Sequence, residues 1–336
     1  MIRWRWGIWA PLVFLCLIVS CSAAFATETT VQSGDDLVGS VQTVLEKRLV
    51  LSYDGQVTAS EAISETQFTV AGLPARVAWY KNYQIYREKS NLYDSHNRLI
   101  ASGTYGRDGV FQPARTYNYN DSGYLQEIQL LKPDGSVFVK KVNRYNGEQL
   151  LTEQMVFDSA NKPDGGYVFL YQPDGRLAAQ HRYDGKGQLL SRISYHYDSQ
   201  SNAWQERVYE GSDSNKPVKE IIYNEMGKKA REINYGSGGD KVREFVCEYN
   251  EAGKKVRQSH YQGDGTKYTE TFFNDDGLPI RFIHYQADGS ERYEEYQYQY
   301  DQRGNWIEKA VISSASGKNP MTGSSREIIQ RTITYY

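Results

Sequence analysis

A short turn motif recurs along most of this chain, and it constrains the fold more than any other feature. Each copy has an aromatic residue, then Asp or Asn, then two further residues and a Gly. Clear copies are YNDSG (119–123), YNEMG (223–227), YNEAG (249–253), FNDDG (273–277) and YDQRG (300–304). A second turn type alternates with the first, as in LKPDG (131–135) and YQADG (285–289). Together the two types place a turn about every 12 to 14 residues, and a period of this length marks a repeat architecture.

The composition of these turns predicts their backbone geometry. In K-P-D-G the proline presets φ near −65°, and the glycine supplies the positive φ that other residues avoid. This pattern predicts a type I turn followed by a G1 bulge, which joins two antiparallel strands. The segment YDSHN (93–97) has Asn97 at the glycine position, and Asn tolerates the left-handed region best after Gly. The predicted structural turn glycines are Gly109, Gly123, Gly135, Gly227, Gly239, Gly253, Gly265, Gly277, Gly289 and Gly304.

The segments between turns predict strands of 7 to 9 residues, because their side chains alternate with a period of two. Tyr296, Tyr298 and Tyr300 share one predicted face, with glutamines opposite. We therefore expect an all-β fold, a long antiparallel meander of some 17 strands with about 26 residues per two strands. A sheet of that length would coil into a spiral, an open barrel or a solenoid. Residues 37–53 and 326–336 have strand patterns without the repeat, and we expect them to cap its ends.

The N-terminus predicts export. Residues 1–26 combine two arginines, an apolar stretch of 12 residues and an Ala-Phe-Ala cleavage site, as in a secretory signal peptide. Ile18-Val19-Ser20-Cys21 also resembles a bacterial lipobox, which would make Cys21 a lipidated N-terminus. Both routes predict a periplasmic protein or a lipoprotein of the outer membrane or cell surface, with membrane contact only through the possible lipid anchor.

Four segments follow from these patterns. They are a signal peptide (1–26), an N-terminal strand and cap region (27–92), the hairpin repeats (93–306), and a C-terminal region with a mobile loop and a capping strand (307–336).

Charge and cysteine content exclude two classes of protein. The 336 residues carry 39 Lys and Arg against 41 Asp and Glu, and this near-neutral balance argues against nucleic-acid binding. The three cysteines cannot form a disulfide framework. Cleavage after Ala26 would leave only Cys247, which we expect to be a packed strand residue.

Part of the repeat resembles a known family. The segments DGSERYEEYQYQYDQRGNW (288–306), RDGVFQPARTYNYNDSGYL (107–125) and GQLLSRISYHYD (187–198) are similar to the tyrosine–aspartate repeat of Rhs and teneurin proteins, and the resemblance covers about residues 93–306. It implies a spiralling β-sheet, which encloses a toxin or serves adhesion in the largest members. This chain ends in TITYY (332–336) without their self-cleavage motif. We therefore expect a small exported bacterial member without a toxin domain.

No catalytic motif stands out. The chain has no G-x-S-x-G, no H-E-x-x-H and no Walker loop. His260 and His284 precede tyrosines in successive turns and could align across the sheet, but they lack a third metal ligand. Glu294 and Glu295 are adjacent, hence on opposite faces, and make a poor acid and nucleophile pair. We expect no enzyme activity, no metal and no cofactor.

The aromatic rows are the feature most suited to binding. Tyr296, Tyr298, Tyr300, Trp306 and Trp204 are candidate ligand-binding residues, because exposed aromatic rings stack on sugars. The alternative is that tyrosine simply holds the sheet together. We expect a non-enzymatic envelope protein that binds another protein or acts as a scaffold. The alternative function is binding of peptidoglycan or surface polysaccharide through these rows.

Overall fold

The computed structural model describes residues 37–51, 55–211, 215–315 and 325–336, and within these ranges the chain forms 22 strands and no helix. The predicted signal peptide, Cys21 and most of the predicted polar loop lie outside the described residues. Among the described residues, none belongs to a helix that is long and apolar enough to cross a membrane.

The strands follow one another without other regular structure between them. The first eleven are β1 (Val41–Leu51), β2 (Val57–Phe68), β3 (Pro74–Lys81), β4 (Gln84–Tyr93), β5 (Leu99–Tyr105), β6 (Phe111–Tyr119), β7 (Leu125–Leu131), β8 (Val137–Tyr145), β9 (Leu151–Phe157), β10 (Pro163–Tyr171) and β11 (Leu177–Asp184). The others are β12 (Leu189–Tyr197), β13 (Trp204–Glu210), β14 (Lys219–Tyr223), β15 (Lys229–Tyr235), β16 (Lys241–Tyr249), β17 (Lys255–Gln262), β18 (Lys267–Phe273), β19 (Pro279–Tyr285), β20 (Glu291–Tyr300), β21 (Trp306–Ala315) and β22 (Ser325–Tyr335).

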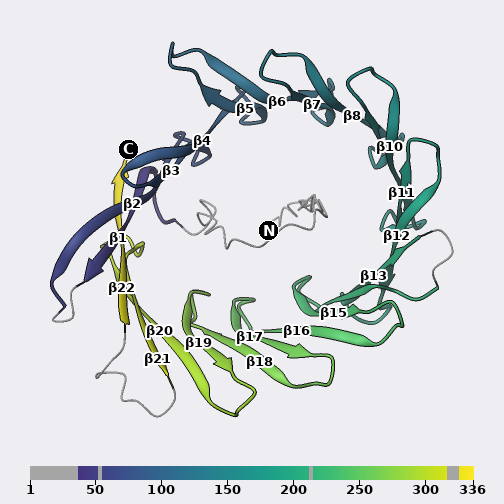
Figure 1. Cartoon of the computed structure of the whole chain (residues 1–336). Helices are drawn as coiled ribbons and strands as arrows, with labels where there is room; N and C mark the ends of the chain where they lie inside the picture. The colour runs from purple at the N-terminus through teal and green to yellow at the C-terminus, as the bar shows by residue number, and fades with distance from the viewer. Residues whose placement is uncertain (1–36, 52–54, 212–214, 316–324) are drawn as a thin grey trace, which may run out of the picture.

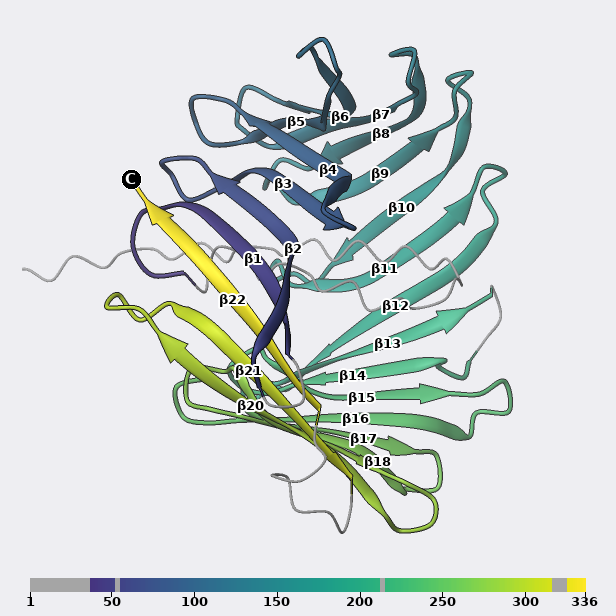
Figure 2. The same cartoon turned by 60° about the vertical axis from the view of Figure 1, so that its left-hand side comes forward.

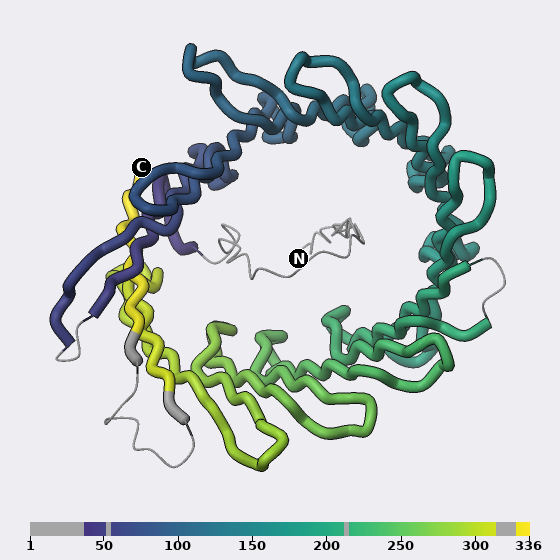
Figure 3. The backbone as a smooth tube through the Cα atoms, viewed as in Figure 1, coloured from purple at the N-terminus to yellow at the C-terminus, as the bar shows by residue number. Residues whose placement is uncertain are grey.

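The strands form a single antiparallel meander that closes into a barrel (Figures 1 and 3). Each strand pairs with the next, and β1 also pairs with β22 from Val41↔Tyr335 to Leu49↔Ile328. The expected all-β meander is therefore confirmed, while the expected open spiral or solenoid is wrong. Closure pairs the two edge strands, whose free N–H and C=O groups would otherwise have to be protected. The segments expected to cap the sheet instead form its closing seam (Figure 2).

The turns have the predicted geometry. Gly123 N–H donates to the Asn120 carbonyl at 2.8 Å, and Asn120 N–H donates to the Tyr124 carbonyl at 2.9 Å. The ten predicted turn glycines all have φ between +69° and +89°, and Asn97 has φ +60°. The G1-bulge hairpin is thus confirmed at these positions.

Because all the connections are hairpins, the turns gather at the two ends of the barrel. We call the end with the turns that follow even-numbered strands (such as 120–124 and 301–305) the even rim. The other end, with the turns that follow odd-numbered strands (such as 106–110 and 262–266), is the odd rim.

A recurring tyrosine joins neighbouring strands at the even rim. The Tyr119 hydroxyl donates to the Leu99 carbonyl at 2.9 Å, and the same bond recurs one period later between Tyr145 and Leu125 at 2.7 Å. The residues that make such a bond to a carbonyl 19 or 20 positions earlier are Tyr93, Tyr119, Tyr145, Tyr171, Tyr197, Tyr249 and Tyr298. The strand register places all of them on one face of the sheet, here called the tyrosine face. The motif's tyrosine therefore has a structural role in each repeat.

Buried apolar residues are few and concentrate at the seam. Val41, Val44 and Phe68 form one cluster, and Leu49 and Ala310 belong to another with Ile328. The sheet thus depends on strand pairing, aromatic contacts and ion pairs around the ring, with its most apolar packing where the ends meet.

Candidate functional site

The predicted tyrosine row on β20 lies on the tyrosine face, but much of it is engaged by the sheet itself. The Tyr298 hydroxyl donates to the Pro279 carbonyl at 3.0 Å, and the Tyr296 hydroxyl donates to Glu294 at 2.6 Å. Burial raises the pKa of both phenols. Tyr300, 41% exposed, is the most accessible of the three.

Trp306 is not the exposed platform that we expected. Its side chain is buried at 8% exposure, and the Arg331 guanidinium lies 3.4 Å from the ring centroid. Tyr298 meets the same ring edge-on at 6.0 Å. This burial follows from the pairing of β21 with β22, because that pairing places Arg331 of β22 over Trp306 at the start of β21.

Trp204 lies in a separate aromatic stack on β13. Its ring is parallel to that of Tyr223 at a centroid distance of 3.7 Å, and Tyr197 lies 6.1 Å away on a neighbouring strand. Tyr223 also donates a hydrogen bond to Glu206 at 3.1 Å, and burial raises the pKa of that carboxyl. Strands β14–β19 separate Trp204 from the β20 row, so the structure does not combine the predicted residues into one site.

The seam contains polar residues that the sequence did not single out. Asn305 is 2% exposed, and its amide joins the segment before β1 to the end of β22. It bonds the Val38 N–H at 2.6 Å, the Val38 carbonyl at 2.8 Å and the Tyr335 hydroxyl at 2.8 Å. Nearby, Arg331 donates to Glu46 at 2.9 Å. These residues close the ring. In the sequence, only the position of Asn305 directly after the turn glycine Gly304 could have drawn attention to them.

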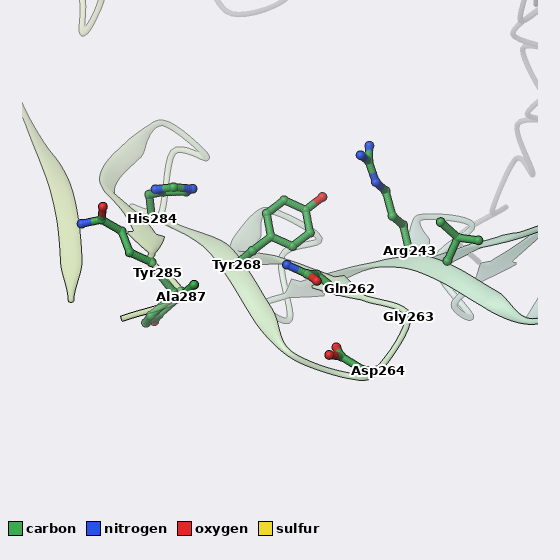
Figure 4. A pocket seen from close by; sticks show the side chains of 10 residues that line it. Arg243, Gln262, Gly263, Asp264, Tyr268, His284, Tyr285 and Ala287 are labelled. Atoms are coloured by element: carbon green, nitrogen blue, oxygen red, sulfur yellow. The ribbon is translucent and has the colours of Figure 1, made fainter. Parts of the chain in front are cut away.

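A cleft of about 790 Å³ opens at the odd rim, beside the turns 262–266 and 286–290 (Figure 4). Its wall includes Arg243 from β16, Tyr268 from β18 and His284 from β19, which project in a common direction. The turns add Gln262, Asp264 and Gln286 to this mostly polar lining. The sequence drew attention to His284 but not to Arg243 or Tyr268, which have no distinctive motif.

The two histidines of the repeat do align across the sheet. His260 and His284 both pair with Thr269, from opposite sides. Burial lowers the pKa of His260, which packs against Phe245 at 4.8 Å and Tyr268 at 5.7 Å. Within the described ranges, no three His, Cys, Asp or Glu side chains come close enough to hold a metal ion.

Cys247 occupies the packed position that we expected for it. Its side chain is 5% exposed in the middle of β16, and burial raises the pKa of the thiol. A buried thiol with a raised pKa reacts slowly, because the thiolate is the reactive form.

Exposed apolar side chains gather at the odd rim near the N-terminal strands. Tyr83 is 69% exposed, Tyr86 63% and Ile85 44%, all in the β3–β4 hairpin. Tyr105 and Val110 are exposed on the next hairpin, β5–β6. We call these five residues the rim patch.

The comparisons with known proteins assign no family. No family model matches the chain, and neither does any curated protein. Among solved structures, a crystal structure of TcdB2-TccC3-Cdc42 is similar at TM-score 0.35 and 11% identity, over 83% of this chain and 17% of that chain. A porin-like protein from Bacteroides uniformis is similar at TM-score 0.26 and 12% identity, over 89% of this chain and 99% of that chain. This chain thus spans about a sixth of the TcdB2-TccC3 chain, and likenesses of this size support no conclusion about its activity.

Proposed function

We propose that this protein is a non-enzymatic scaffold of the bacterial envelope that binds another envelope protein through the rim patch. The signal-peptide and lipobox patterns support an exported protein in the periplasm or at the cell surface. The tyrosine–aspartate motifs support membership of the Rhs-like repeat class. The closed ring suits a scaffold, because strand pairing around the whole circumference holds its hairpins in fixed positions.

The rim patch carries this proposal. Tyr83 has φ +63° beside Asn82 at φ +50°, in a two-residue turn where glycine is the usual second residue. A bulky residue in this left-handed conformation costs about 1–2 kcal/mol. Tyr83 recovers little of that cost by packing, because it is 69% exposed. A side chain that strains the turn and points to solvent is better suited to contact with a partner than to stabilisation of the fold.

The chemistry of the patch favours a protein with an apolar and acidic surface. Tyrosine is enriched at the energetic centres of protein interfaces, since one ring buries a large area at low entropic cost. Lys81 at the end of β3 and Lys89 in β4 are both exposed and belong to the same hairpin as Tyr83 and Tyr86. A partner that covers the two rings and offers carboxylates to the lysines would match both features.

The test uses the immobilised protein and a solubilised envelope extract, with retained protein and retained sugar both measured. The double variant Tyr83→Ser/Tyr86→Ser should lose a retained protein at least tenfold. The matched control, Val70→Ser/Met226→Ser, removes two exposed apolar side chains from the even rim and should keep it. Equal retention by both variants would refute the rim patch as the binding surface.

Sugar binding by the predicted aromatic row has less support. Trp306 is buried beneath Arg331, and the Tyr296 and Tyr298 hydroxyls already have partners within the sheet. Retained glycan that is lost on Tyr300→Ala would nevertheless favour this alternative over a protein scaffold.

A further inference from the structure

The lining of the cleft at the odd rim includes one arginine, Arg243, and one carboxylate, Asp264 on the 262–266 turn. Arg243 lies in the cleft wall, and Arg292 lies opposite the cleft residue His284 in the strand register, where it interacts electrostatically with the Asp288 carboxylate. Both arginines are exposed, and neither forms an ion pair with another residue in the described part of the chain. The opposite face of the same strands differs, because there Arg231 is paired with Glu244. Arg243 is therefore available to an anionic ligand at the cleft.

An aromatic ring lies between Arg243 and His284. Figure 4 shows Tyr268 between Arg243 and His284, with all three projecting to the same side. His260 meets the Tyr268 ring edge-on at 5.7 Å and is itself held by Phe245 at 4.8 Å. Burial lowers the pKa of His260 and so favours its neutral form, which packs against the edge of the tyrosine ring. A braced ring of this kind can stack on a flat, partly apolar ligand face.

The backbone of the cleft wall is fixed by close packing. A Cβ atom on Gly263 would lie 2.1 Å from the Lys241 carbonyl oxygen, so only glycine lets the 262–266 turn approach β16 this closely. This packing places the Gln262 amide at the cleft, where it can donate and accept hydrogen bonds. Gln286 lines the cleft from the 286–290 turn, and its amide nitrogen donates one hydrogen bond to the Ser290 hydroxyl at 2.7 Å. A volume of about 790 Å³ falls within the range of small-molecule sites.

We propose that this cleft binds an acidic saccharide. The sugar carboxylate contacts Arg243, the sugar ring stacks on Tyr268, and the hydroxyl groups bond to Gln262, His284 and Gln286. The arginine sets the requirement for an anion, while the ring and amides set the requirement for a polyhydroxylated ligand rather than a simple ion. This site is independent of the rim patch and of the β20 row, and it does not rest on the scaffold function.

Calorimetric titration of the whole protein tests the proposal, with a galacturonic acid trimer as the probe. The carboxyl-reduced trimer should bind at least tenfold more weakly, and so should the trimer to Arg243→Ala, because a charge-assisted contact is lost in each case. Arg281→Ala is the matched control, since it removes an equal charge from the opposite face of β19 and should change affinity less than twofold. Equal weakening by the two arginine variants would overturn the proposal in favour of general electrostatic attraction.

Two further measurements test stacking and the nature of the anion. Tyr268→Phe keeps the ring and should retain affinity within about twofold, whereas Tyr268→Leu should lose about tenfold. Unchanged unfolding temperatures will show that the variants remain folded. Binding of galactose 6-phosphate without binding of the trimer would overturn the carboxylate assignment and indicate a phosphate site. No binding of the trimer at millimolar concentration would overturn the proposal altogether.

Discussion

Replacement of Asn305 by alanine tests whether the seam is a local closure of the ring. The amide group of Asn305 makes three hydrogen bonds, two with the Val38 backbone and one with the Tyr335 hydroxyl, and its side chain is 2% exposed. Each bond contributes about 0.5–1.5 kcal/mol net, and a buried group left without a partner costs about 1–3 kcal/mol. Because Tyr335 keeps its bond to Asp301, we expect a total loss of about 2–4 kcal/mol.

The loss should be local, and amide hydrogen exchange can show this. Only the β1–β22 pairing closes the ring, so the seam can open while the other strand pairs persist. In Asn305→Ala, protection of the β22 amides Thr332–Thr334 should fall by about thirtyfold to a thousandfold, the equivalent of that free energy. Protection of the β11 and β12 amides, on the far side of the ring, should stay within about threefold of the wild type.

Two control variants make this experiment decisive. Lys254 follows the turn glycine as Asn305 does, but it is exposed, so Lys254→Ala should change β22 protection by less than about threefold. Asn305→Asp keeps an acceptor for the Val38 N–H but cannot donate to the Val38 carbonyl, and it places a second carboxylate near Asp301. Its β22 protection should therefore fall at least as far. Unaltered β22 exchange in Asn305→Ala, or equal loss on both sides of the ring, would refute the reasoning.

Four further predictions concern single side chains. Burial raises the pKa of Glu206, so the folded state favours its neutral form, and the wild type loses this stabilisation as pH rises through the folded-state pKa. The free energy of unfolding of Glu206→Gln should therefore rise relative to that of the wild type between pH 4 and pH 8, as urea unfolding can measure. Burial disfavours ionisation of Glu244, but its ion pairs with Arg231 and Lys241 outweigh this and lower its pKa. The stability that these pairs contribute is lost as pH falls through the folded-state pKa, so Glu244→Gln should be less stable than the wild type at pH 7 and the difference should narrow as the pH falls in urea unfolding. Gly103→Ala would place a Cβ atom 2.1 Å from the Gln112 carbonyl oxygen, so thermal unfolding should show a loss of more than about 2 kcal/mol in the free energy of unfolding. Gly109→Ala should lose only about 1 kcal/mol, because the added Cβ meets open space. Cys247 should react with a thiol reagent at least a hundredfold faster in denaturant than in the native protein, and rapid native labelling would contradict its burial.

The local features of the fold could be predicted from residue patterns because they depend on neighbours in sequence. Gly123 and Asn97 needed left-handed backbone conformations, and the structure has them there. The alternation of Tyr296, Tyr298 and Tyr300 placed them on one face, as strand geometry requires. The candidate site was less accessible to this reasoning. Its chemistry depends on Arg243, whose lack of an ionic partner cannot be read from its own segment.

The sequence alone therefore determined the hairpin unit, since turn geometry and period-two alternation are imposed within a few residues. The tertiary structure decided whether the meander closes. Pairing of β1 with β22 joins residues such as Val44 and Ile333, almost 300 positions apart, and depends on the accumulated twist and coil of every strand between them. Closure turned the expected caps into a seam. The cleft likewise exists only because separate hairpins lie side by side at one rim, an arrangement that no single repeat encodes.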